Sequence, residues 1–197
     1  MHCMTTTNND ICGCIIAGGK SRRFRQDKGL YVYRGKPMIE HVYAAMKNEM
    51  ADILISGDDA SKYSFLGLEC VPDIIPGRGP IAGIYSALMR CRKKIFAVAC
   101  DMPFLDSGLI RHMISASDGH DVTVPFIDGN YEPLHAIYSP SCAQHIKTLI
   151  DHDDRRIIHF FDSVSVRKIT GDEIRRFCDP EKTFRNINYI EDLDASI

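Results

Sequence analysis

The sequence lacks the features that mark a membrane protein, a nucleic-acid-binding protein or a secreted protein. Its apolar runs fall far short of the roughly 20 residues that span a bilayer. Its formal net charge of -2 at pH 7 is unlike that of a strongly basic DNA- or RNA-binding domain. Residues 1–10 are polar and contain no apolar segment of a secretory signal. We therefore expect a cytoplasmic protein with neither a membrane nor a nucleic acid as partner.

Cysteine pairs of the kind that bind zinc are also absent. None of the eight cysteines belongs to a Cys-x-x-Cys pair, and Cys12-x-Cys14 has no second pair to complete a tetrahedral site. Most of the cysteines lie within apolar runs, which is typical of buried thiols in a reducing compartment. The sequence therefore predicts neither a disulfide scaffold nor a structural metal.

Length and composition favour one globular domain. The 197 residues are 45% apolar and 25% charged, which is ordinary for a folded domain with a substantial core. No repeat, linker or low-complexity stretch divides the chain. We expect a single domain over residues 1–197, with residues 1–10 flexible.

One stretch near the N-terminus organises the rest of the chain. The apolar run 11–16 breaks at Gly18 and Gly19, and five cations follow within nine residues: Lys20, Arg22, Arg23, Arg25 and Lys28. Glycine permits positive φ, so the backbone there can present several N–H groups to a phosphate. The pattern predicts a buried strand that leads into a loop holding a nucleoside triphosphate.

This loop has two other possible interpretations. An ATP-binding P-loop would need a glycine where Cys14 stands, and an apolar helix after Ser21, so the motif is incomplete. The glycines could instead only turn the chain, with the cations on solvated surface. That second alternative stays open on residues alone.

Strands alternate with helices at a spacing that predicts a three-layer, doubly wound α/β fold, with a mostly parallel sheet and helices on both faces. The expected strands cover residues 11–16, 52–56, 68–71, 94–100, 121–125, 133–138 and 163–166. The expected helices cover residues 37–47, 58–66, 81–89, 108–115, 139–150 and 172–177, with a terminal helix capped by Asn188 and Glu191.

Two further features are expected at the carboxyl ends of these strands. The glycine- and proline-rich segment 72–80 leads into a helix whose N-terminus would suit an anionic ligand, although an ordinary loop explains it equally well. Asp101 follows the most apolar strand, where ligands gather in open α/β sheets. A carboxylate there can hold a metal bound to phosphates. A turn-capping role for Asp101 is the alternative, but Asp106 already supplies the next helix cap.

Several of these segments together resemble one family. Ala17-Gly18-Gly19-x-Ser21-x-Arg23-Phe24-x-x-Asp27-Lys28 resembles the signature of nucleotidyltransferases, in the variant carried by molybdenum cofactor guanylyltransferases and their cytidylyltransferase relatives. Matching segments follow in the family's order: Gly79-Pro80-Ile81-Ala82-Gly83, Cys100-Asp101-x-Pro103, Arg155-Arg156-Ile157 and Asn186-x-Asn188. Arg25 departs from the pattern, because the family usually has a glycine there.

The resemblance implies a Rossmann-like, nucleotide-diphospho-sugar transferase fold and transfer of GMP from GTP to the terminal phosphate of molybdopterin. It implies Arg23, Lys28 and Asp101 as catalytic residues, with Mg²⁺ on Asp101. The implied nucleotide-binding residues are Ile16, Ala17, Gly18, Gly19, Lys28, Ser56, Asp73, Gly79 and Asp101. The implied acceptor-binding residues are Arg155, Arg156, Asn186 and Asn188. Other molybdenum-cofactor proteins and recipient apoenzymes would be further partners.

Two alternatives to this function stay open. A cytidylyltransferase of the same fold, acting on molybdopterin or a sugar phosphate, would carry the same motifs, because base choice depends on a few pocket contacts. A protein that binds nucleotide and delivers the cofactor without chemistry is the other. His135 falls in a segment that resembles the family near the acceptor side, and a half-buried structural role is expected for it.

Overall fold

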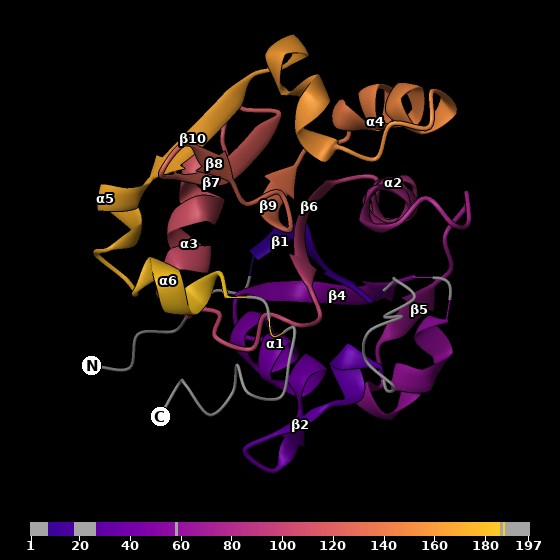
Figure 1. The fold of residues 1–197 in the computed structure, drawn as a ribbon, viewed down its shortest axis with the longest axis vertical. Helices are drawn as coiled ribbons and strands as arrows, with labels where there is room; N and C mark the ends of the chain where they lie inside the picture. The colour runs from indigo at the N-terminus through magenta and orange to yellow at the C-terminus, as the bar shows by residue number, and fades with distance from the viewer. Residues whose placement is uncertain (1–7, 18–26, 58, 186, 188–197) are drawn as a thin grey trace.

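An eight-stranded sheet forms the centre of the molecule (Figure 1). The computed structural model describes residues 8–17, 27–57, 59–185 and 187. Within them the strand order is β10-β7-β9-β6-β1-β4-β5, and β8 pairs with β7. The strands are β1 (Asn8–Ile16), β4 (Met50–Ser56), β5 (Glu69–Val71), β6 (Lys94–Ala99), β7 (Val122–Ile127), β8 (Asn130–Tyr131), β9 (His135–Tyr138) and β10 (Val166–Thr170). A separate two-stranded sheet joins β2 (Val32–Tyr33) to β3 (Lys36–Pro37).

The sheet is mostly parallel, as predicted. β1 pairs in parallel with β4 on one side and β6 on the other, so that Cys14 lies between Leu54 and Ala97. β9 runs antiparallel to both β6 and β7. Strands of a parallel sheet are covered on both faces and read as continuous apolar runs, which explains the uninterrupted burial of β1 from Ile11 onward.

Helices cover both faces of the sheet and divide the core in two. Alternate residues of β1 point to opposite faces: Ile11 and Ile15 belong to one apolar cluster, whereas Cys12 and Cys14 belong to the other. Figure 1 shows α2 (Pro80–Cys91) and α4 (Cys142–Asp151) on one side of β1 and β4, and α1 (Met38–Met46) on the other. α3 (Ser107–Ala116) shares the first cluster with α1. This confirms the three-layer α/β fold.

Gly13 shows how closely one of these helices packs. A Cβ atom built on Gly13 would lie 2.7 Å from Cε of Met46 in α1 and 3.0 Å from Cγ1 of Ile53 in β4. Such contacts are too short for carbon atoms, so a side chain at position 13 would force the Met46 and Ile53 side chains to repack.

Some elements differ from the sequence predictions. Residues 157–163 form a 3₁₀ helix, η3 (Ile157–Ser163), because Phe160 and Phe161 pack into the second apolar cluster. The strand predicted over 163–166 was wrong, because pairing with β7 begins only where Val166 meets Val122. Residues 8–10 were expected to be flexible but belong to β1.

The remaining short elements complete the described chain. They are η1 (Lys28–Leu30), η2 (Ala60–Leu66), α5 (Gly171–Ile174) and α6 (Pro180–Thr183). α6 was not predicted, and it begins where the Asp179 carboxylate accepts the Glu181 N–H at 3.0 Å. The predicted terminal helix from Asn188 lies outside the described residues. Within the part of the chain that the structure describes, no helix is both long and apolar enough to cross a membrane.

Candidate active site

Four parallel strands end together at one edge of the sheet. Ile16 at the end of β1 lies in register with Ser56 of β4 and Ala99 of β6, and Ser56 in turn pairs with Val71 of β5. Beyond the strands, the Ala17 N–H donates to the Ser56 carbonyl at 2.8 Å. The chain segments predicted to bind nucleotide therefore leave the sheet side by side, as expected for a ligand site in an open α/β sheet.

Lys28 and Asp101 meet at this edge, although 73 positions separate them in the sequence. Lys28 Nζ lies 2.9 Å from Asp101 Oδ2, and the two side chains are 22% and 14% exposed. Lys28 begins η1, and Asp101 follows β6. The structure thus brings together a cation and a carboxylate that were both predicted as catalytic, and it leaves each partly open to solvent.

Asp27, beside Lys28, is held by three groups. Its Oδ1 accepts the Gly29 N–H at 3.0 Å and the Tyr63 hydroxyl, and its Oδ2 forms an ion pair with Lys62. Partial burial disfavours the charged carboxylate, but the hydrogen bonds from Lys62 and Tyr63 outweigh it and lower the pKa of Asp27. An ionised Asp27 therefore fixes the backbone just before Lys28.

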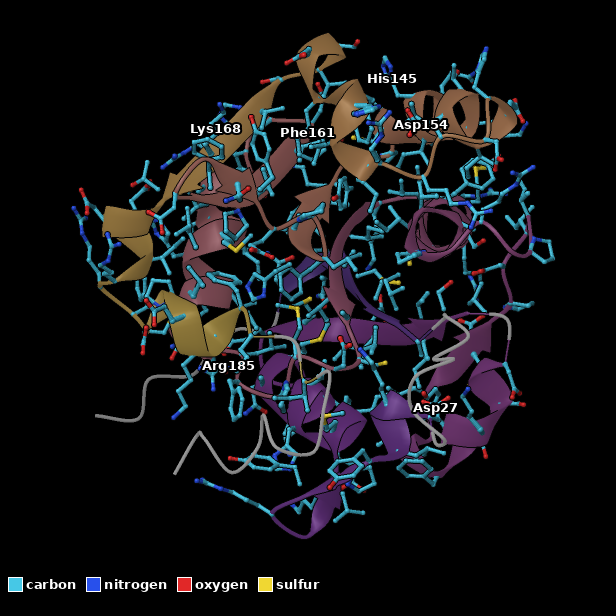
Figure 2. All side chains as sticks on the ribbon, in the orientation of Figure 1. Asp27, His145, Asp154, Phe161, Lys168 and Arg185 are labelled. Carbon is cyan, nitrogen blue, oxygen red and sulfur yellow. The ribbon has the colours of Figure 1, made fainter. Side chains whose placement is uncertain are left out.

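Tyr63 and Lys62 were missed from sequence. They lie on η2, between β4 and β5, and Tyr63 is fully buried. Position 29 must stay small, because a Cβ on Gly29 would lie 2.6 Å from the Tyr63 hydroxyl oxygen. The one available signal was the placement of 58–66 directly after a strand that ends at the site. Figure 2 shows Asp27 on the β5 side of the molecule.

The pKa of the Cys100 thiol shows which charged groups lie close to it. Burial raises the pKa of Cys100 to about 12, with contributions in the same direction from the negative charges of Asp101 and Asp27. Lys28 and Lys62 act in the opposite direction on the same thiol. Two carboxylates and two ammonium groups therefore lie near one buried sulfur atom, so the Asp27-Lys28 turn and Asp101 form one charged cluster.

The start of α2 reaches the same edge of the sheet. Gly79 is the N-cap residue, with φ of 74°, a conformation that favours glycine. A Cβ on Gly83, in the first turns of α2, would lie 3.1 Å from Ile16 Cδ1 and 3.5 Å from Ser56 Oγ. Asp73 is buried, 9% exposed, in the loop that leads to α2. The N-terminus of α2 therefore lies beside the strand ends, and the partial positive charge of a helix N-terminus suits an anionic ligand.

The two predicted acceptor arginines lie on the turn after α4. Arg155 and Arg156 are 61% and 72% exposed, and their guanidinium groups approach Asp153 at 3.8 Å and Asp154 at 3.4 Å. Asp153 also forms an ion pair with Arg78, in the loop before Gly79. The structure therefore places the arginine turn beside the α2 loop. Asp154 is labelled near α4 in Figure 2.

The C-terminal segment reaches Asp101 from the other side. The Ile187 N–H donates to the Asp101 carbonyl at 3.2 Å, and Ile187 is fully buried beside Tyr33 and Met38. Asn186 and Asn188, the sequence neighbours of Ile187, lie outside the described residues, as do Gly18, Gly19 and Arg23. Their predicted roles stay predictions.

A polar cavity of about 400 Å³ lies next to that segment. The turn between β7 and β8 and the end of α6 line it, with Glu132 and Arg185 among its residues. Burial raises the pKa of Glu132. Arg185, which lines the cavity, lies two residues before Ile187, whose backbone N–H donates to the Asp101 carbonyl.

His135 is buried more deeply than the sequence suggested. It is 0% exposed and lies edge-on to Phe96 and Phe184, at ring separations of 5.1 and 5.0 Å. Neither ring nitrogen has a hydrogen-bond partner among the described residues. Burial lowers the pKa of His135 to about 3, so the imidazole is neutral at physiological pH. The geometry favours a packing role, not a catalytic one.

We expect His135 to make the free energy of unfolding depend on pH in the acidic range. Its pKa is lower in the folded state than the ordinary value of 6.5, so protons bind the unfolded chain preferentially. Its contribution is complete above pH 6.5 and falls by about 1.4 kcal/mol per pH unit down to about pH 3. Urea denaturation of wild type and His135→Leu between pH 7 and 4 should show this extra loss in wild type only. Parallel pH curves for the two proteins would contradict the assignment.

Comparisons with known proteins agree with this geometry. Residues 13–166 match the model of the MobA-like NTP transferase domain. A protein of Pelotomaculum thermopropionicum named probable molybdenum cofactor guanylyltransferase is 38% identical over 182 residues, 92% of this chain and 89% of that protein. The molybdenum cofactor guanylyltransferase of Desulfosudis oleivorans is 32% identical, covering 94% of each chain. A crystal structure of molybdopterin-guanine dinucleotide biosynthesis protein A from Archaeoglobus fulgidus superposes with a TM-score of 0.80 at 27% identity, covering 93% of this chain and 95% of that one.

Proposed function

The chain belongs to the MobA-like NTP transferase family, a family of nucleotidyltransferases, and we propose that it transfers GMP from GTP to the terminal phosphate of molybdopterin. The products are pyrophosphate and the guanine dinucleotide form of the cofactor. The observation that carries the proposal is the contact of Lys28 with Asp101, at the edge where β1, β4, β5 and β6 end. The names of the relatives supply the choice of guanine and of the acceptor.

The reaction requires positioning more than acid–base chemistry. The acceptor phosphate is ionised at neutral pH, so it can attack the α-phosphorus without a strong general base. The protein must hold nucleophile and leaving group in line and neutralise the charge that develops on pyrophosphate. We assign that charge neutralisation to Lys28, together with Arg23. We assign hydrogen bonding of the triphosphate to the backbone N–H groups of Gly18, Gly19 and the α2 N-terminus.

The residues fit a magnesium ion, provided that the nucleotide supplies part of its coordination. Mg²⁺ usually keeps several waters and binds through one or two carboxylates plus substrate phosphates. Among the described residues no group of three or more His, Cys, Asp or Glu side chains could hold a metal alone. Asp101, 14% exposed and already beside a cation, suits the single-carboxylate arrangement. When bound there, the ion would offset negative charge on the phosphates.

Asp27 and its partners would support this arrangement indirectly. Tyr63, Lys62 and the Gly29 N–H hold the ionised carboxylate, so η1 begins at a fixed place and its first residue, Lys28, projects toward Asp101.

The seven cysteines within the described residues are all free thiols, which supports the expected cytoplasmic location.

Pyrophosphate release measured with GTP, CTP and ATP, each with molybdopterin and Mg²⁺, tests the proposal. We expect release with GTP to exceed that with CTP or ATP by about 100-fold, because a pocket built for one base leaves buried polar groups unpaired with another. A preference for CTP would make the protein a cytidylyltransferase. Tight GTP binding without single-turnover transfer of radiolabelled GMP would make it a delivery protein. Either result would overturn the proposal.

Arg155 offers a separate test of the acceptor side. Its guanidinium is 61% exposed and its nearest carboxylate, on Asp153, is 3.8 Å away, so it is available to a phosphate. We expect Arg155→Ala to raise the KM for molybdopterin about tenfold while leaving the Kd for GTP unchanged. Arg175→Ala, on a comparably exposed arginine that pairs with Asp172 in α5, is the matched control. An unchanged KM would remove Arg155 from the acceptor site.

A further inference from the structure

Two cysteine side chains meet at the opposite edge of the sheet from the candidate active site. Cys12 lies in β1, and Cys91 is the last residue of α2. α2 crosses β1 with its first turns over the strand end, where Gly83 contacts Ile16, and its last turn over the strand start. There Cys91 packs against the apolar cluster that contains Cys12, and both residues line one cavity. Cys91 also lies only four residues before Ile95, the β6 partner of Cys12.

The pairing follows from the apolar stripe of α2. Ile84, Leu88 and Cys91 recur at intervals of four and three residues, so they share the helix face that packs on the sheet. Ile84 and Leu88 belong to the same apolar cluster as Cys12, and Cys91 packs against that cluster. Cys91 is thus directed at β1 by the helix geometry. Cys91 is also the last residue of α2, and Arg92 after it adopts the left-handed conformation that ends the helix. The helix therefore continues on only one side of Cys91.

The two thiols have different environments. Interaction with Cys12 lowers the pKa of Cys91, against an opposing effect of burial, and the nearby charges of Lys93 and Arg90 lower it further. Its interaction with Cys91 and its burial raise the pKa of Cys12 far above the ordinary value. Cys12 is only 3% exposed, whereas Cys91 is partly exposed. Because Cys91 is the more exposed of the two, it is the thiol that a small molecule meets first, and Cys12 is the protected second thiol.

A small molecule can reach the pair. A cavity of about 440 Å³ is lined by both cysteines and by Lys93 and Asp52, among other residues. Lys93 Nζ is held 2.6 Å from Asp52 Oδ2 and 2.7 Å from the Asn9 carbonyl, which keeps its charge at the mouth of the cavity.

We propose that Cys12 and Cys91 form a reversible redox site whose substrate is a small peroxide. The Cys91 thiolate attacks the O–O bond and takes one oxygen as a sulfenic acid, and the other oxygen leaves as water or an alcohol after taking up a proton. Cys12 Sγ then attacks the Cys91 sulfur, the S–O bond breaks, and the hydroxide leaves as water with the Cys12 proton. Two thiols lose two electrons in total, and the peroxide gains them.

A disulfide between Cys12 and Cys91 would link β1 to α2, and the other ends of both elements lie at the candidate active site. β1 ends at Ile16 and Ala17, and α2 begins after Gly79. The redox site requires neither the nucleotide nor the acceptor.

Thiol counting on the reduced full-length protein tests the proposal. One equivalent of hydrogen peroxide should lower the number of thiols titrated in denaturant by two from the eight in the sequence, and dithiothreitol should restore them. Tandem mass spectrometry of a non-reduced digest should find Cys12 linked to Cys91. Cys12→Ser and Cys91→Ser should each abolish the loss of two thiols. Cys70→Ser, at a partly exposed cysteine whose pKa burial raises, should retain it.

Three results would overturn the proposal: no loss of thiols, a disulfide that joins Cys91 to Cys14, or an undiminished loss of two thiols in Cys12→Ser. Thermal melts show whether each serine variant is folded. A second measurement needs no variant, because in reduced wild type iodoacetamide should alkylate Cys91 at least about five times faster than Cys70 at pH 7. Equal rates at the two sites would also refute it.

Discussion

Asp101→Ala is expected to reduce guanylyl transfer by about 1,000-fold or more, equivalent to about 4 kcal/mol of transition-state stabilisation. The carboxylate lies at the end of β6, where the phosphates of a nucleotide would approach, and we assign to it the anchoring of the magnesium ion. Its removal would also leave Lys28 without its partner at 2.9 Å. Initial rates of pyrophosphate release with saturating GTP and Mg²⁺ measure the effect.

The fold should survive this substitution. The side chain of Asp101 is partly exposed, and the backbone hydrogen bond from Ile187 to the Asp101 carbonyl does not involve the carboxylate. We therefore expect the free energy of unfolding to change by about 1 kcal/mol or less. Asp52→Ala is the matched control, because Asp52 forms a similar ion pair with Lys93, at 2.6 Å, near the opposite edge of the sheet. Near-normal transfer by Asp101→Ala would remove Asp101 from the reaction.

Lys28→Ala should raise the Kd for GTP about tenfold and lower kcat/KM by about 100-fold, a loss of about 2.7 kcal/mol. The Lys28 side chain is 22% exposed and lies at the strand ends. There its ammonium group can stabilise negative charge on the triphosphate and then on the departing pyrophosphate. The loss in kcat/KM exceeds the loss in binding, because the charge on the leaving group is largest in the transition state. Isothermal titration with GTP and steady-state kinetics separate the two effects.

Lys93→Ala is the control for this second substitution, since it removes a lysine from an ion pair remote from the site. Lys28→Arg should recover part of the binding, because it retains the charge, but less of kcat, because the guanidinium is larger and differently shaped. A Kd for GTP that is the same in Lys28→Ala as in wild type would exclude Lys28 from the triphosphate site.

The sequence predicted the framework of the site well, because that framework depends on local patterns. The apolar run before Gly18, the proline at the start of α2 and the apolar strand before Asp101 each signal where a strand ends or a helix begins. In a parallel sheet these ends converge on one edge, so the placement of Ile16, Ser56 and Asp101 followed from the fold class alone.

The contacts that tune the site were not predictable in the same way. The Tyr63 hydroxyl on Asp27 joins residues 36 positions apart, and the ion pair of Arg78 with Asp153 joins residues 75 positions apart. No hydrophobic periodicity or short motif connects the two residues of either pair in the sequence. The depth of His135 was also missed, because its neighbours Phe96 and Phe184 come from β6 and from the turn after α6.

The sequence by itself determined the α/β class, the order of strands along the chain, the family and the segments that end near the ligand. These depend on hydrophobic periodicity, glycine and proline positions and short motifs, all of which are local. Only the tertiary structure decided that Lys28 pairs with Asp101, that η2 holds Asp27, and that Cys12 faces Cys91. Those contacts depend on which strands lie side by side and how helices cross them, and long-range packing of the whole core sets that geometry.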